Sequence, residues 1–200
     1  MAELTTALPS FAAVILAGGL GRRMGYQQKG LMQLNQRPLI DYVLDRVRPY
    51  TGKIVISANQ AMDSYAQFSY PVVSDLERYT QRGPLAGIYS AMMSLPNHIE
   101  FIQILPCDTP YLPDDLILNF YHYLQAHDDK DLVIAMTEDK EHPVIMQCRR
   151  SVIPKLKAYL DDPRLLNRVM SFIRSCNYGI IQFNNNEQFT NINDPSLLEV

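Results

Sequence analysis

The stretch that decides the fold is FAAVILAGGLGRRMG, residues 11–25. Its first six residues are apolar and partly β-branched, and the run is too short for a lone helix, so we predict a buried strand. Glycines at 18, 19 and 21 follow at once, and a chain without side chains turns sharply and lets backbone N–H groups approach an anion. Arg22, Arg23 and Lys29 place three positive charges beside this turn. The stretch therefore predicts a phosphate site between a strand and a helix.

The spacing excludes two better-known phosphate loops. A Walker loop ends in Lys-Ser or Lys-Thr, and neither pair occurs in the chain. A dinucleotide fingerprint has glycine three residues after its second glycine, where this chain has Met24. The plain alternative is a connecting turn with solvated arginines, but three cations beside three glycines is more charge than such a turn needs.

Composition indicates one folded domain and narrows the partners. The 200 residues are 47% hydrophobic, enough for one substantial core, and we treat 1–200 as a single domain. A net charge of −3 and a pI of about 5.8 argue against a general nucleic-acid binder. No segment approaches the roughly 18 apolar residues of a membrane helix, and the three cysteines lie far apart. We therefore predict no membrane association and a cytoplasmic location.

Apolar runs and helical spacing alternate along the chain. Strands are predicted at 11–16, 54–56, 71–73, 101–105, 132–136, 143–148 and 180–183. Helices are predicted at 38–47, 83–95, 113–124, 151–160 and 163–175, and 76–82 is predicted to be an exposed loop. The charged turn at 138–141 is short enough for a hairpin. The pattern predicts an α/β fold of three layers, with a mainly parallel sheet, an antiparallel member and helices on both faces.

Polar residues follow the predicted strands at the points where these end. They are the glycine loop, Ser57 to Asn59, Asp75 and Asp108. In open α/β sheets, ligands bind beyond the carboxyl ends of the strands. The positions of these residues therefore predict one shared active site.

Several segments together resemble a known family. LAGG at 16–19, RMG at 23–25 and KGL at 29–31 resemble the nucleotidyltransferase signature, in particular that of the molybdenum cofactor guanylyltransferases. GPLAGI at 83–88 and PCDTP at 106–110 extend the resemblance. It implies a Rossmann-like nucleotidyltransferase fold and transfer of GMP from GTP to the phosphate of molybdopterin, with release of pyrophosphate. It also implies Mg²⁺ as cofactor and transient contact with proteins that make or receive the product.

Such a reaction joins two anions, so the protein must cancel repulsion and align the reacting groups. Lys29 is the candidate mobile cation, because a lysine ammonium on a long stem can follow charge between phosphate oxygens. Arg23 occupies the arginine of the family pattern. Asp108 is the candidate magnesium ligand, because magnesium binds a carboxylate together with substrate phosphates. The alternatives are a solvated loop lysine and an aspartate that caps its own turn.

The resemblance also assigns binding positions. The predicted nucleotide-binding residues are Leu16, Ala17, Gly18, Gly19, Lys29, Ser57, Asn59, Asp75, Gly83 and Asp108. The predicted residues for the second substrate are Arg168, Asn191 and Asn193, although asparagines in a turn before proline need no function. His142 also fits the pattern, and we expect it to be structural because the nucleophile is already ionised.

The chain departs from the family pattern before its lysine and at the second strand. Tyr26 and Gln28 stand where the family has glycine and aspartate, and Ser57 stands where it has asparagine. Two other enzyme readings therefore stay open, a cytidylyltransferase of the same cofactor and a sugar-phosphate nucleotidyltransferase. A third reading, motivated by Gln28, is a nucleotide-binding regulator that has lost turnover.

Overall fold

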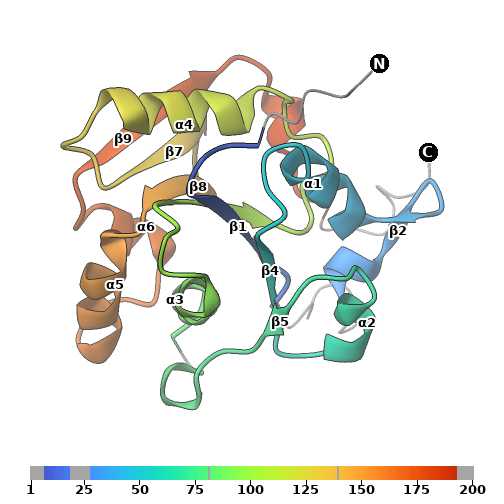
Figure 1. Cartoon of the computed structure of the whole chain (residues 1–200), viewed down its shortest axis with the longest axis horizontal. Coiled ribbons are helices and arrows are strands. Elements are labelled where there is room, and N and C mark those ends of the chain that lie inside the picture. Colours follow the sequence, from blue (N-terminus) through green and yellow to red (C-terminus); the bar gives the residue numbers. More distant parts are fainter. Residues whose placement is uncertain (1–6, 19–27, 81, 139, 193–200) are drawn as a thin grey trace.

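The computed structural model describes residues 7–18, 28–80, 82–138 and 140–192 (Figure 1). Within these residues, seven strands form one sheet in the order β5-β4-β1-β6-β8-β7-β9. In chain order the strands are β1 (Phe11–Leu16), β4 (Ile54–Ser57), β5 (Val72–Val73), β6 (Phe101–Pro106), β7 (Leu132–Thr137), β8 (Lys140–Arg149) and β9 (Tyr178–Phe183). Every predicted strand is present, with ends that differ by a few residues.

The sheet is mainly parallel, as predicted. Strand β1 pairs in parallel with β4 and β6, β4 with β5, and β7 with β9. Strand β8 is antiparallel to both β6 and β7, and it forms the predicted hairpin with β7. The antiparallel member is thus β8, inserted between two parallel groups.

Helices cover both faces, so the sheet is the middle of three layers (Figure 1). Alternate residues of β1 point to opposite faces, as the period of a strand requires. Phe11, Ala13 and Ile15 pack in the core with α1 (Leu39–Val47) and α4 (Leu116–Ala126). Ala12 and Val14 pack in the core with α3 (Pro84–Ser94), α5 (Val152–Asp161) and α6 (Val169–Ile173). Because both faces are buried, the strand sequence is continuously apolar.

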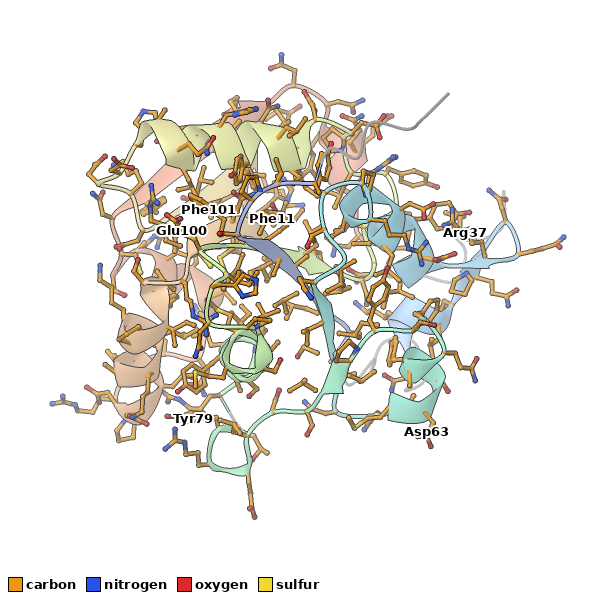
Figure 2. The ribbon with its side chains drawn as sticks, viewed as in Figure 1. Phe11, Arg37, Asp63, Tyr79, Glu100 and Phe101 are labelled. Carbon is orange, nitrogen blue, oxygen red and sulfur yellow. The ribbon has the colours of Figure 1, made fainter. Side chains whose placement is uncertain are left out.

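Aromatic contacts anchor α4 on the sheet. Phe11 and Phe101 are register partners on β1 and β6, and Figure 2 shows them near the centre of the molecule. The Tyr121 ring of α4 meets both edge-on, with ring centroids 6.1 Å from Phe11 and 5.0 Å from Phe101. Such edge-to-face pairs add to the stabilisation from buried area.

The helix predicted at 163–175 is wrong in its first half. Only α6 is helical, and it begins at Val169. Backbone groups that would form helical hydrogen bonds are bonded to side chains instead. The side chain of Asp162 accepts from the Arg164 backbone and guanidinium, and Arg82 donates to the carbonyls of Asp162 and Leu165. These bonds hold the segment in an irregular conformation.

Two other segments differ from expectation. The predicted exposed loop at 76–82 contains the 3-10 helix η3 (Glu77–Tyr79), and Tyr79 is buried against the ring of Tyr89. The short helix α2 (Met62–Ala66) was not predicted, because five residues are too few for a helical pattern to show. Its only fully buried side chain is that of Tyr65, which belongs to the core that contains α1.

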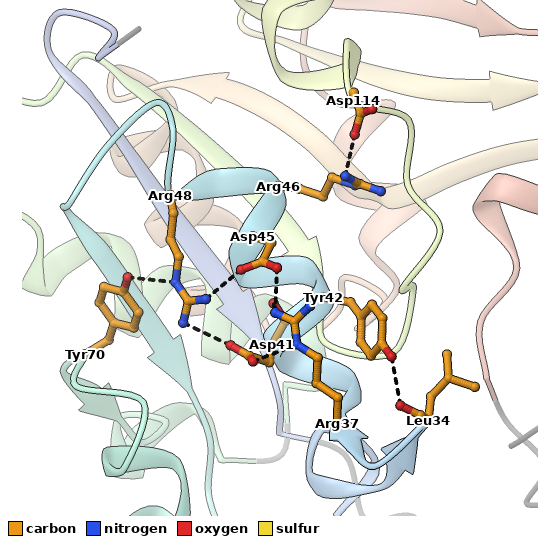
Figure 3. Close-up of polar contacts among 9 residues, drawn as sticks. All are labelled: Leu34, Arg37, Asp41, Tyr42, Asp45, Arg46, Arg48, Tyr70 and Asp114. Carbon is orange, nitrogen blue, oxygen red and sulfur yellow. Dashed lines mark hydrogen bonds and ion pairs between the residues drawn. The ribbon is translucent and has the colours of Figure 1, made fainter. Parts of the chain in front are cut away.

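A small hairpin and a set of ion pairs lie beside α1 (Figure 3). The hairpin joins β2 (Gln33–Leu34) to β3 (Arg37–Pro38). Arg37 donates to Asp41 Oδ2 over 2.8 Å and to Asp45 Oδ2 over 2.5 Å, and Arg48 donates to Asp45 Oδ1 over 2.6 Å. Burial pushes the pKa of Asp45 up, but the two arginines outweigh it and lower this pKa.

These contacts connect the hairpin to the glycine-loop lysine. The 3-10 helix η2 (Lys29–Leu31) comes directly before the hairpin, and the Leu39 amide at the start of α1 donates to the Met32 carbonyl over 2.9 Å. The hairpin, α1 and η2 are therefore held together, and the position of Lys29 depends on this support.

Candidate active site

A cavity of about 250 Å³ opens where β1, β4 and β6 end at their carboxyl termini. Backbone hydrogen bonds continue past these strand ends: the Ala17 amide donates to Ser57 O, and the Cys107 amide donates to Leu16 O. The loops that follow neighbouring strands are therefore kept side by side. The predicted site residues that line the cavity are Leu16, Ala17, Gly18, Lys29, Ser57, Asp75, Gly83, Asp108 and Asn191.

Two polar side chains meet the carboxylate of Asp108, which is almost fully buried. Lys29 Nζ lies 3.1 Å from Asp108 Oδ2, and Asn191 Nδ2 donates to Asp108 Oδ1 over 2.7 Å. The side chain of Asp108 is 8% exposed and that of Lys29 is 29% exposed. The Ile192 amide also donates to the Asp108 carbonyl over 2.8 Å. Residues far apart in the chain thus fix one carboxylate from both sides.

A second polar pair lies across the cavity. Asn59 Nδ2 donates to Asp75 Oδ2 over 3.0 Å, and the Asp75 amide donates to Asn59 Oδ1 over 2.8 Å. Burial raises the pKa of Asp75, and the bond from Asn59 partly offsets the rise. Asp75 lines the cavity, while Asn59 orients it. The pair presents one carboxylate oxygen to a ligand.

Helix α3 approaches this pair closely because residue 87 is glycine. A Cβ at Gly87 would lie 2.5 Å from Ser57 Oγ and 3.3 Å from Asp75 Oδ1. Gly83, at the N-terminal end of the same helix, has a φ of +60°, which favours glycine. Gly83, Pro84 and Gly87 line the cavity, so the N-terminal end of α3, where the helix dipole is positive, lies beside it and favours an anion.

Among the other predicted positions that the structure describes, Asn59 and Arg168 do not line the cavity. Arg168 is exposed at the N-terminus of α6 and does not line the cavity, although the carbonyl of its neighbour Asn167 lies only 3.1 Å from where a Cβ of Gly83 would be. Gly19, Arg23 and Asn193 lie outside the described residues. The structure therefore brings most of the predicted residues together but leaves Arg168 at a distance from the cavity lining.

Gln28 does not face the charged centre. Its Nε2 donates to Gln60 Oε1 over 2.8 Å, on an exposed part of the surface. The carboxylate of Asp108, in the turn after β6, lies 3.1 Å from Lys29 Nζ. The loss of an acidic residue at position 28 therefore leaves Lys29 with an acidic neighbour.

A family model described as a MobA-like NTP transferase domain matches residues 13–177. The chain belongs to this family. The resemblance predicted from the motifs is confirmed, and the matched region includes Lys29, Asp75 and Asp108. Asn191 lies beyond it.

Curated relatives of this MobA-like chain share about a third of its residues. The molybdenum cofactor guanylyltransferase of Vibrio cholerae is 35% identical over 197 residues, which cover 98% of this chain and 93% of that protein. The molybdenum cofactor guanylyltransferase of Shewanella halifaxensis is 35% identical over 184 residues, covering 92% and 89%. Both alignments extend along nearly the whole chain.

Solved structures confirm the fold. The molybdopterin-guanine dinucleotide biosynthesis protein A of Archaeoglobus fulgidus aligns with a TM-score of 0.74 at 21% identity, covering 94% of this chain and 95% of that one. CMP:2-keto-3-deoxy-manno-octonic acid synthetase, solved with CTP, aligns with a TM-score of 0.71 at 11% identity, covering 94% and 95%. Chains with different named substrates thus share this architecture, so the fold alone does not select the nucleotide.

Two features of this MobA-like site were missed from the sequence. Gly87 was part of the quoted GPLAGI segment, but only its packing against Ser57 shows why the position is glycine. Asn191 was predicted to serve the second substrate, and the structure shows that it lines the cavity and also donates to Asp108. No local pattern signals a contact between residues so far apart in the chain.

Proposed function

We propose that the chain is a molybdenum cofactor guanylyltransferase that transfers GMP from GTP to the terminal phosphate of molybdopterin. A phosphate oxygen of molybdopterin forms a new bond to the α-phosphorus of GTP, and the bond from that phosphorus to the bridging oxygen breaks to release pyrophosphate. The names of the curated relatives and their coverage of nearly the whole chain support this choice of substrates.

The observation that carries the proposal is the meeting of Lys29 and Asp108 at the carboxyl ends of the strands. A phosphoryl transfer between anions needs a positive group near the phosphates and a carboxylate for the metal. Lys29 would neutralise phosphate charge, and the positive end of the α3 dipole would favour the bound anion. Asn59 and Asp75, on the other side of the cavity, would hydrogen-bond to the ribose or the base.

Magnesium fits this site only in partnership with the nucleotide. The described residues include no group of three or more acidic, histidine or cysteine side chains able to hold a metal ion. Asp108 accepts one hydrogen bond at each carboxylate oxygen, and each oxygen keeps a second lone pair. Magnesium is commonly bound by one or two carboxylates together with substrate phosphates. We therefore propose that Asp108 holds the ion, which would neutralise charge on the leaving pyrophosphate.

The second substrate must approach the same cavity from its open side. We propose that Asn191 and Arg168 border this approach, because Asn191 lines the cavity and the segment before Arg168 contacts Gly83. Arg23 and Asn193 remain proposed contributors on the strength of the family pattern. The part of the chain that the structure describes contains no helix of sufficient length and apolarity to cross a membrane. The cytoplasmic location and the transient protein partners stay predictions.

Pyrophosphate release separates the candidate functions. The protein is mixed with magnesium, molybdopterin and each of GTP, CTP, ATP and UTP in turn, and the dinucleotide product is identified by mass. Release with GTP alone is expected. Release with CTP alone would identify a cytidylyltransferase. Release only when a sugar phosphate replaces molybdopterin would identify a sugar-phosphate nucleotidyltransferase. Tight binding without release would identify a regulator.

The Asp108→Asn variant tests the metal-binding role. The side chain keeps its size, so the fold should persist while magnesium-dependent turnover falls by about 100-fold or more. The matched control is Asp63→Asn, because Asp63 is an exposed aspartate at the start of α2 that does not line the cavity. Figure 2 shows it at the periphery of the molecule. Equal turnover of the Asp108→Asn and Asp63→Asn variants would remove Asp108 from the metal site.

A further inference from the structure

Gly30 lies at the centre of a packed contact behind the charged pair. It is the middle, buried residue of η2, directly after Lys29. A Cβ at this position would lie 3.0 Å from Tyr65 Oη and 3.1 Å from both Tyr65 Cε1 and Cys107 Sγ. These distances are shorter than most Cβ contacts in proteins. The side chains of Tyr65 and Cys107 therefore fill the space that a side chain at residue 30 would occupy.

Each neighbour of Gly30 is held by a different part of the fold. Cys107 is buried and directly precedes Asp108, and its amide donates to Leu16 O, so the sheet sets its backbone position. Tyr65 is fully buried and comes from α2, where its amide donates to the Ala61 carbonyl over 3.1 Å. Gly30 is therefore in contact with the sheet through Cys107 and with α2 through Tyr65.

Both side chains are neutral and lack an evident chemical task. Burial raises the pKa of the Tyr65 phenol and of the Cys107 thiol. The Tyr65 hydroxyl is buried, and the backbone of Gly30 is the polar group that it meets. The contact of this oxygen with Gly30 is therefore both steric and polar.

We propose that Tyr65, Gly30 and Cys107 form a spacer that sets the distance between Lys29 and Asp108. Lys29 is one residue before Gly30 and Asp108 is one residue after Cys107, so the separation of Gly30 from Cys107 controls the separation of the charged side chains. Tyr65 presses on Gly30 from α2 and keeps η2 against Cys107. Tyr65 and Cys107 are positioning residues, which act on the phosphates only through Lys29 and Asp108.

The inference rests on the proposed function for its kinetic consequence, but the spacing can be measured independently. If η2 moves away from Cys107, Lys29 no longer reaches Asp108 at 3.1 Å. A displacement of about 1 Å at a reacting centre can slow catalysis about 100-fold while the substrate still binds. A spacer therefore predicts a loss in kcat that is larger than the change in the KM for GTP.

The test adds one methyl group and then removes one of the atoms that it would meet. Gly30→Ala should lengthen the Lys29 Nζ to Asp108 Oδ2 distance beyond 4 Å in a crystal structure and lower kcat at least tenfold. Gly30→Ala combined with Cys107→Ala removes the sulfur, and should recover much of both the distance and kcat. The control is Gly52→Ala, because a Cβ at Gly52 meets nothing within 4 Å. Its distance and kcat should equal those of the unchanged protein.

Three outcomes would overturn the proposal. The first is an unchanged distance from Lys29 Nζ to Asp108 Oδ2 in Gly30→Ala, and the second is an unchanged kcat of that variant. The third is a double variant, Gly30→Ala with Cys107→Ala, whose loss in kcat equals the sum of the two single losses. A purely structural role would lower the melting temperature of each variant without rescue of kcat. If Gly30→Ala does not fold, Tyr65→Phe decides the matter: removal of the oxygen should lower kcat severalfold with GTP affinity retained, and an unchanged kcat refutes the spacer. Absence of turnover in the unchanged protein would count against the proposed function, and the measured distances would still decide the inference.

Discussion

Replacing His142 by glutamine tests how the fold holds the segment that leads to Asn191. His142 is buried on β8, and its ring lies 4.9 Å from the ring of Phe189. Its Nε2 is 2.8 Å from Thr137 Oγ1, and that hydroxyl donates to Asn186 Oδ1 over 2.6 Å. A hydroxyl has one hydrogen, so Thr137 accepts from His142 and the imidazole carries a proton on Nε2.

The size of the effect follows from the pKa of His142. Burial, followed by repulsion from Lys140, lowers this pKa from 6.5 to about 4. Below pH 6.5 the unfolded chain therefore takes up a proton that the folded chain refuses, and the free energy of unfolding falls as the pH drops. Linkage of the two pKa values gives a loss of about 2 kcal/mol between pH 7 and pH 5. The loss levels off below about pH 4, where the folded protein is protonated too.

Urea unfolding at pH 7 and at pH 5 measures this loss. The His142→Gln variant should be less stable at pH 7, because it loses ring packing on Phe189, and its stability should fall by about 2 kcal/mol less than that of the unchanged protein on going to pH 5. The control is His98→Gln, because His98 is exposed. The reasoning is refuted if all three proteins lose the same stability between the two pH values.

Two further changes test the cavity wall and the support of η2. Gly87→Ala should weaken GTP binding about tenfold by calorimetry, because its methyl group would lie 2.5 Å from Ser57 Oγ, and addition of Ser57→Ala should recover part of the affinity. Equal affinity of Gly87→Ala and the unchanged protein would contradict this contact. Arg37→Ala removes the bonds to Asp41 and Asp45 and should lower the unfolding free energy by about 1 kcal/mol at low salt and by less in 1 M salt. A loss that is independent of salt would show that the pairing is not electrostatic.

The sheet could be predicted because its central strands are buried on both faces. Strand β1 is a continuous apolar run, and β6 is interrupted only by Gln103. A glycine follows β1 closely and Asp108 follows β6, so both the strands and the residues after them are visible in the sequence. The alternation of strands and helices then placed Ser57, Asp75 and Asp108 at one edge. Local pattern and global fold agree at these positions, which is why the prediction succeeded.

The missed features depend on contacts that no local pattern contains. Residues 163–168 have helical spacing, but Arg82 captures the carbonyls that would continue a helix. Helix α2 is too short to show a period, yet it supplies Tyr65 to the back of the site. The bond from Asn191 to Asp108 spans 83 residues and appears only after the chain has folded. Tertiary contacts decided each of these cases.

The bond from Asn191 to Asp108 has a consequence for the protein during its synthesis. Asp108 follows β6, which can pair with β1 once both strands have left the ribosome, but the side chain that donates to its Oδ1 belongs to a residue 83 positions later. Until Asn191 has emerged, the Asp108 carboxylate is without this amide. The last strand of the sheet, β9, ends at Phe183, so a chain terminated between Phe183 and Asn191 should contain every strand of the sheet but lack this hydrogen bond.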